Sequence, residues 1–203
     1  LVVPNYLDEF TAAPTVRRGW AEQKLYVTPA DGSRDTPFEI KLPKQEGVGN
    51  FRRTVWAADN RSLIVDRVDK DTKRRQLFYV FHAGSKDEQI ITIADETDEK
   101  WQAPLSSIVE PNPKDANQLL FCSEKDGFNH IYLAKLSPEP SSPAAADPAA
   151  KVQEGGQRLK PEATVSQLTK GNWQVEWAKW TAGGDIAYSS TEESPDERQF
   201  YIY

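Results

Sequence analysis

The chain has 203 residues, of which 38% are hydrophobic and 10% aromatic, with 31 acidic against 25 basic side chains. This composition is typical of a folded protein, and a net charge of −6 with no basic stripe argues against a nucleic-acid partner. No run of residues approaches the roughly 18 apolar positions that a membrane-spanning helix needs.

Cysteine usage limits the chemistry further. Cys122 is the only cysteine, so an intrachain disulfide and a cysteine-based metal site are both excluded. It lies in the apolar run 119–122, which indicates a buried structural thiol and not a nucleophile. The chain has no methionine and too short an N-terminal apolar run for a signal peptide, so we expect a piece of a longer polypeptide.

Short apolar and aromatic runs alternate with turn-forming clusters along the chain, and helical periodicity is almost absent. This is the signature of β-strands, and it predicts an all-β fold. Four tetrads read polar, apolar, aromatic, apolar, at residues 24–27, 76–79, 130–133 and 199–202. A charged loop and, before it, an apolar strand precede each of the last three tetrads, with these strands at 63–65, 119–121 and 186–188. A further strand is expected after the first three tetrads, at 38–42, 89–94 and 164–168.

The repeat predicts the architecture. The tetrads start 52, 54 and 69 residues apart, and four strands in a unit of about 50 residues are typical of a β-propeller blade. The long last interval contains a Pro/Ala-rich insertion at 137–163, expected to be an exposed excursion between two strands. We therefore predict a partial β-propeller of three to four blades of four antiparallel strands, divided as an incomplete first blade (1–50), two blades (51–95 and 96–170, the second with the insertion) and an incomplete last blade (171–203).

Catalytic machinery is not visible in the sequence. Serine hydrolases of the α/β type present their nucleophile in a Gly-x-Ser-x-Gly turn, and no such pentad occurs. His82 and His130 are 48 residues apart at strand ends, where local hydrogen bonds are expected, and they give no metal-ligand spacing. The carboxylate pairs 95–96 and 192–193 lie in polar turns, which favours solvated charge over a glycosidase pair.

The tryptophans are the remaining candidates for a binding role. Trp56 and Trp180 precede turns at matching blade positions, which predicts core packing for both. Trp101 and Trp173 open successive blades, where an aromatic ring either packs between blades or faces the central funnel.

Three ordered motifs resemble a known family. Residues 121–133 (Phe-Cys-Ser-Glu-Lys-Asp-Gly-Phe-Asn-His-Ile-Tyr-Leu) resemble the Ser-Glu-x-x-Gly-aromatic-x-His-Leu-Tyr signature of the prolyl oligopeptidase family, in its dipeptidyl peptidase IV branch. Residues 167–175 are similar to the Leu-Thr-x-Gly-x-Trp-x-Val that follows there, and residues 194–201 to its Pro-x-Glu-Arg-x-Leu-Tyr. The resemblance extends from Thr54 onward, and residues 56–79 are similar to the preceding blade.

The resemblance implies a two-part serine peptidase in which a propeller covers a C-terminal α/β-hydrolase domain and filters peptide substrates by size. The family's Glu-Glu pair that holds the substrate amine falls outside this chain, and Glu192 and Glu193 stand at a different place. Only Trp101 is carried over from the family: it resembles a tryptophan beside the segment that lines the extended substrate subsites there, so it is the one substrate-facing residue we expect. No catalytic residue, metal or cofactor is expected in this chain.

The favoured hypothesis is a non-catalytic, substrate-gating propeller portion of a dipeptidyl-peptidase-like serine exopeptidase, whose partners are the hydrolase domain and a peptide. A homodimer is left open. The resemblance also implies a periplasmic or secreted location. The alternatives are a propeller that scaffolds protein contacts without catalysis and, less favoured, a five-bladed glycosidase.

Overall fold

The structure is a computed structural model that describes residues 23–33, 36–44, 49–100, 108–137 and 161–203. Over these ranges the chain forms β-strands and no helix, which confirms the predicted all-β class. The strands are β1 (Leu25–Val27), β2 (Phe38–Ile40), β3 (Gly49–Trp56), β4 (Leu63–Asp69), β5 (Arg74–Phe81), β6 (Gln89–Thr97), β7 (Val109–Pro111), β8 (Gln118–Ser123), β9 (His130–Ser137), β10 (Glu162–Gln167), β11 (Val175–Trp180), β12 (Ile186–Ser190) and β13 (Gln199–Ile202). No described segment is a helix long and apolar enough to cross a membrane.

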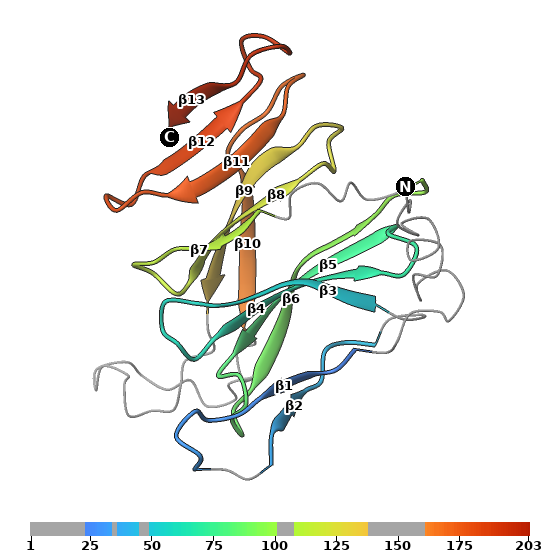
Figure 1. Ribbon diagram of the computed structural model, residues 1–203, viewed down its shortest axis with the longest axis vertical. Helices are drawn as coiled ribbons and strands as arrows, with labels where there is room; N and C mark the ends of the chain where they lie inside the picture. The colour runs from blue at the N-terminus through green and yellow to red at the C-terminus, as the bar shows by residue number, and fades with distance from the viewer. Residues whose placement is uncertain (1–22, 34–35, 45–48, 101–107, 138–160) are drawn as a thin grey trace, which may run out of the picture.

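The strands form four antiparallel sheets in chain order. The first sheet pairs β1 with β2, the second runs β3-β4-β5-β6, the third β7-β8-β9-β10 and the fourth β11-β12-β13. Each strand pairs with its neighbour in sequence, so every sheet is a meander. Figure 1 shows the sheets following one another from the blue N-terminal pair to the red fourth sheet. Sheets of two, four, four and three strands are consistent with a partial, open propeller.

The two middle strands of the second sheet are buried on both faces. Six consecutive residues of β4 (63–68) and seven of β5 (75–81) are buried. A strand between two neighbouring sheets is buried on both sides, which explains the unbroken apolar runs at 63–65 and 77–81. The buried polar side chains between these runs bond to one another, as Arg75 does to Asp66 and Arg67 to Gln76. Alternation is kept where one face is more open, as at the C-terminal half of β9.

Three apolar clusters lie between successive sheets. Ile40 of the first sheet packs with Val65 and Phe78 of the second. The opposite face of the second sheet, including Ile64 and Tyr79, packs against the third sheet in the largest cluster. The third and fourth sheets meet through a cluster of buried side chains, which are Ile108, Leu120, Cys122, Ile131, Val175, Ala178, Ile186 and Tyr188. Burial of one such large aliphatic or aromatic side chain contributes about 1.5–3 kcal/mol.

The observed bounds of the sheets can be compared with those of the predicted blades. The second, third and fourth sheets extend over 49–97, 109–167 and 175–202. The strand expected at 164–168 begins two residues earlier, at Glu162, where it pairs with Ser137 of β9. Most of the insertion predicted at 137–163 lies outside the described residues, and the division of the chain into blades remains a prediction.

Candidate functional site at the loop end of the sheets

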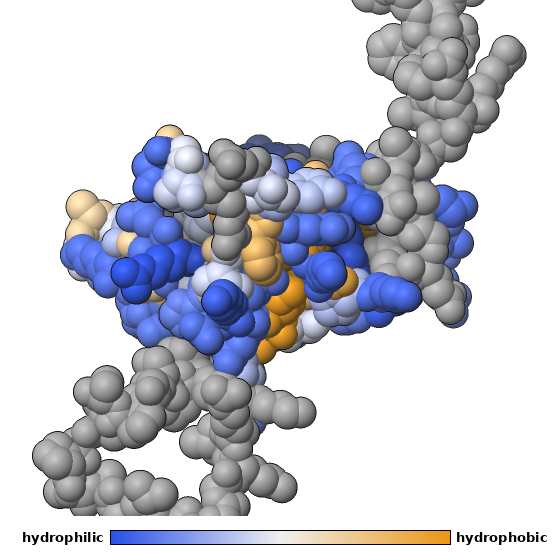
Figure 2. All heavy atoms as spheres, turned by 90° about the horizontal axis from the view of Figure 1, so that it is seen from below, coloured by the Kyte–Doolittle hydropathy of each residue, from blue (hydrophilic) through white to orange (hydrophobic). Residues whose placement is uncertain are grey.

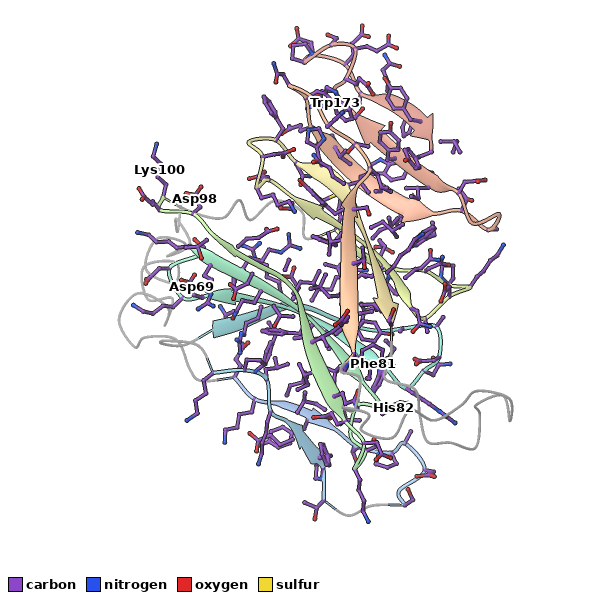
Figure 3. All side chains as sticks on the ribbon, turned by 180° about the vertical axis from the view of Figure 1, so that it is seen from behind. Asp69, Phe81, His82, Asp98, Lys100 and Trp173 are labelled. Atoms are coloured by element: carbon purple, nitrogen blue, oxygen red, sulfur yellow. The ribbon has the colours of Figure 1, made fainter. Side chains whose placement is uncertain are left out.

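The meander topology brings several loops to the same end of the sheets. In a four-stranded meander, the turn between the second and third strands and the connection leaving the fourth strand share one end. We call this the loop end; its described segments are 70–73, 98–100, 124–129, 168–174 and 191–198. Figure 3 shows Asp69, Asp98 and Lys100 at this end of the second sheet, with Phe81 and His82 at the other.

His130 joins the third and fourth sheets at the loop end. Its ring is fully buried, with Nδ1 3.1 Å from the Thr169 hydroxyl and Nε2 3.0 Å from the Gly171 carbonyl oxygen. The Trp173 indole packs on the imidazole in an edge-on arrangement, with ring centroids 4.9 Å apart. We call these four residues the His130 junction. The motifs at 121–133 and 167–175 therefore meet in space.

The hydrogen bonds of the His130 junction determine the tautomer of the ring. A carbonyl oxygen only accepts, so Nε2 carries the proton and donates to Gly171. In the neutral ring Nδ1 then accepts from the Thr169 hydroxyl, whose oxygen accepts the Ile131 amide at 2.9 Å. Every polar group of this contact is satisfied, which is what a buried polar cluster requires. Since Thr169 and His130 are both buried, their hydroxyl–imidazole pair is not available to a substrate.

Gly171 permits the close approach of Trp173. Its φ is +141°, a backbone conformation that residues with a side chain rarely adopt. A Cβ at this position would overlap the indole ring of Trp173. The Gly-x-Trp spacing therefore has a steric cause.

A buried ion pair joins the second and third sheets. The Arg75 guanidinium donates from Nε to Asp66 Oδ1 at 3.0 Å and from Nη2 to Oδ2 at 3.2 Å, and Asp66 is fully buried. Nη1 of Arg75 donates to the Cys122 carbonyl oxygen of β8 at 2.5 Å. Burial by itself lowers the pKa of Arg75, but the Asp66 carboxylate more than offsets this and raises it. Arg75 is therefore a charged connection from β5 to β4 of its own sheet and to β8 of the third sheet.

Acidic side chains surround this connection at the loop end. The Ser123 hydroxyl donates to Glu96 at 2.6 Å, which adds a second polar link between the two sheets. Partial burial raises the pKa of Glu124; Arg75 opposes this shift, and the nearby Asp98 and Glu96 carboxylates reinforce it. No group of three or more His, Cys, Asp or Glu side chains among the described residues could hold a metal ion.

Glu110 connects the first strands of three sheets. Its carboxylate forms an ion pair with Arg53 of β3 at 3.0 Å. Its backbone carbonyl accepts the Trp180 indole N–H of β11 at 3.1 Å. Glu110 of β7 is thus bonded to β3 on one side and to β11 on the other. These three strands are the first strands of their sheets.

The structure tests three of the four tryptophan predictions. Trp101 lies outside the described residues, so its expected substrate-facing role remains a prediction. Trp173 packs between the third and fourth sheets, which agrees with the expected packing between blades and not with a position facing the funnel. Trp180 is half-buried, but the core position predicted for Trp56 is wrong, because its side chain is 43% exposed. Trp180 is covered because it bonds to Glu110 of β7, the first strand of the preceding sheet. The sheet that precedes Trp56 has only the strands β1 and β2 among the described residues, and no corresponding strand covers Trp56.

The candidate nucleophile and acid–base groups do not assemble. Cys122 is buried, and burial raises the pKa of its thiol to about 12, so it stays protonated at neutral pH. His82 is exposed in the turn after β5 with φ of +51°. Glu192 and Glu193 are exposed in the turn after β12.

Sequence reasoning missed the Asp66–Arg75 pair. A signal was present, because Asp66 directly follows the apolar run 63–65, and a charge that continues a buried strand requires a partner. The partner lies nine residues away on the adjacent strand, where Leu77 is paired with Asp66 and Arg75, two positions before Leu77, reaches Asp66 diagonally.

Comparisons with known proteins agree with the observed fold. A family model described as the dipeptidyl peptidase IV (DPP IV) N-terminal region matches residues 20–202. The fold is similar to that of a solved Bacteroides ovatus protein assigned as a dipeptidyl aminopeptidase IV, with a TM-score of 0.52 at 15% sequence identity. The match covers 89% of this chain and 28% of that one, so the chain corresponds to about a quarter of the larger protein.

Proposed function

Because the chain belongs to the family of dipeptidyl peptidase IV N-terminal regions, we propose that it is the non-catalytic, substrate-gating propeller portion of a serine exopeptidase that releases short peptides from N-termini. The observation that carries the proposal is the family match over residues 20–202. In this proposal the nucleophile is supplied by an α/β-hydrolase domain of a longer polypeptide, and the propeller controls which peptides reach it.

The chemistry of the described residues supports a non-catalytic role. Acyl transfer needs an activated nucleophile with a base in reach and a donor site for the oxyanion. The Thr169 hydroxyl and the His130 ring are hydrogen-bonded to one another but buried. The Cys122 thiol is buried and neutral. Neither the Thr169–His130 pair nor the Cys122 thiol can attack a peptide bond in solution.

The buried polar contacts between the sheets support a gating role. A size filter requires an opening whose walls do not separate when a peptide enters. The Arg75 connection and the His130 junction hold the loop ends of three successive sheets together through buried hydrogen bonds. A buried, satisfied polar network of this kind fixes one arrangement of its elements.

The test compares this chain with a longer polypeptide that continues into a hydrolase domain. We expect the longer polypeptide to release dipeptides from chromogenic dipeptidyl substrates and to react with an active-site serine reagent. We expect the 203-residue chain to do neither. Hydrolysis that copurifies with the 203-residue chain would disprove the non-catalytic role.

Gating is tested in the longer polypeptide with substrates of increasing length and with a folded protein that carries the same N-terminus. We expect kcat/KM to fall steeply for the folded protein. Equal kcat/KM for the short peptide and the folded protein would favour the scaffold alternative for the propeller.

A further inference from the structure

One face of the second sheet carries two arginines and one carboxylate near its loop end. Strand pairing sets Arg67 of β4 opposite Gln76 of β5, and Gln76 opposite Asp95 of β6. Arg74 precedes Gln76 by two positions on β5, so its side chain points to the same face. We call these four residues the Arg67 cluster. Their face is the one that packs on the first sheet, through Phe78.

The Arg67 guanidinium is held in place by uncharged groups. Its Nη2 donates to the Pro43 carbonyl oxygen at 2.9 Å and to Gln76 Oε1 at 2.6 Å. The group also lies over the Phe78 ring, 4.9 Å from the ring centroid. Arg67 is only 8% exposed, yet both of its hydrogen-bond acceptors are neutral. Arg75, on the opposite face of the sheet, is equally buried but bonds to a carboxylate.

The one carboxylate of the Arg67 cluster is already bound elsewhere. Asp95 accepts from Arg74 Nε at 2.7 Å and Nη2 at 2.6 Å, and from Gln76 Nε2 at 3.0 Å. Asp69, two positions after Arg67, accepts the backbone amides of residues 73 and 74. Burial and the Arg74 charge lower the pKa of Arg67, and Asp95 only partly opposes them. The cluster therefore has an excess of one positive charge.

Several N–H groups of Arg67 have no acceptor in the part of the chain that the structure describes. A guanidinium has five N–H donors, and Arg67 uses only the two on Nη2. Nε is buried without a hydrogen-bond partner, and Nη1 forms no hydrogen bond either. A buried charged donor without a partner is costly, whereas an acceptor of opposite charge forms a strong hydrogen bond with it. The Arg74 side chain beside it is 37% exposed, so a small ion can approach from solvent.

We propose that the Arg67 cluster binds a small oxyanion, whose oxygen accepts from the unpaired N–H groups of Arg67 while Arg74 contributes a second positive charge. Phosphate and carboxylate groups share this chemistry, and arginine binds both. The molecule seen from the side of the first sheet is mostly hydrophilic (Figure 2), which favours an ion over an apolar partner. The inference goes beyond the proposed function and does not depend on it.

Inorganic phosphate is the probe, titrated against the 203-residue chain at constant ionic strength and followed by phosphorus NMR line width. We expect saturable broadening, and a Kd at least about tenfold higher in Arg67→Gln, because the unpaired donors are removed. Arg53→Gln is the matched control, since Arg53 is a half-exposed arginine of the same sheet that pairs with Glu110, and it should leave the Kd unchanged. The absence of saturable binding, or an equal Kd in Arg67→Gln, would overturn the inference.

Asp95→Asn gives a second test that does not depend on the folding of Arg67→Gln. The change removes the carboxylate that competes for the arginines, so phosphate should bind several-fold more tightly. An unchanged or higher Kd would overturn the inference, because the anion would then bind away from Arg74.

Competition with acetate identifies the source of the anion. Loss of the phosphate broadening when acetate is added would support a carboxylate ligand, such as that of a peptide. Broadening that persists in acetate would support a free phosphate-type ion. Broadening that sodium chloride at the same ionic strength removes equally well would overturn the inference, because it would show general charge attraction and not an oxyanion site.

Discussion

At the scale of single residues, the polar side chains that matter are buried and serve the junctions between sheets. Arg75 reaches Asp66 on its own sheet and the Cys122 carbonyl on the next, and both of its carboxylate contacts are direct hydrogen bonds. Burial removes the screening by water that weakens ion pairs at the surface. The neighbouring residue allows a buried and a half-exposed ion pair to be compared, because Arg74 pairs with Asp95 at 2.6 Å in contact with solvent.

The first prediction compares these two ion pairs. Asp66→Asn should lower the free energy of unfolding by about 3–5 kcal/mol, because it removes the charge of the carboxylate that accepts two hydrogen bonds from the buried Arg75 guanidinium. The matched change Asp95→Asn should cost about 0–1 kcal/mol, because both partners are in contact with solvent. Urea unfolding followed by tryptophan fluorescence measures both. Similar losses in the two variants would show that burial does not decide the strength of the pair.

At the scale of structural elements, the His130 junction connects two strands through a loop. The 168–174 loop leaves β10 and enters β11, and backbone hydrogen bonds link both of its ends to the start of β9, from Leu168 N to Ile131 O and from Val175 N to Asn129 O. The loop is thus fixed by its backbone at both ends and by His130 and Trp173 in the middle. Its conformation depends on the one position that lacks a side chain.

The second prediction concerns that position. Gly171→Ala should destabilise the protein by about 2–4 kcal/mol, because the strain of a positive φ adds to the overlap with Trp173. Gly184→Ala is the control, since Gly184 has φ of +104° with nothing within 4 Å of the added Cβ, and it should cost only about 1–2 kcal/mol. Thermal unfolding gives both values. Equal costs would mean that Trp173 moves aside without loss.

At the scale of the whole molecule, the sequence pattern predicted the arrangement of strands well because it repeats. Each tetrad coincides with the start or body of a strand, as at Gln199–Ile202, and strand order followed from short turns between neighbours. The boundaries were less accurate: the strand expected at 89–94 continues to Thr97, beyond the register shift that a bulge opposite Leu77 and Phe78 introduces.

The site was less predictable than the fold, for a physical reason. Local periodicity reports which residues are buried but not which partner a buried charge meets, because that partner lies on another strand. His130 was correctly expected to satisfy local hydrogen bonds, yet its partners Thr169 and Gly171 are about 40 residues away. Trp56 was misplaced because its sequence position matches that of Trp180, while the neighbouring strand that covers Trp180 has no described counterpart beside Trp56.

The whole molecule is a series of sheets joined by contacts of unequal strength. The second and third sheets share the largest apolar cluster, the Arg75 connection and the bond from the Tyr79 hydroxyl to the Ala116 carbonyl at 2.7 Å. The first sheet has two strands of three residues each and packs through the smallest cluster. A two-stranded ribbon is marginal without such packing.

The last prediction follows from this inequality. Native-state hydrogen exchange should show that the amides of β1 and β2 open at a free energy at least about 2 kcal/mol below that of β4, β5, β8 and β9, which corresponds to roughly 30-fold faster exchange. Mass spectrometry of peptides spanning 25–40, 63–81 and 118–137 measures these strands in one sample. The Asp66→Asn variant provides the control, since loss of the Arg75 connection should accelerate exchange in β4 and β5 and bring the two regions closer. Uniform exchange of all four sheets in the unmodified chain would instead show that they unfold as one cooperative unit, with the first sheet as firmly held as the rest.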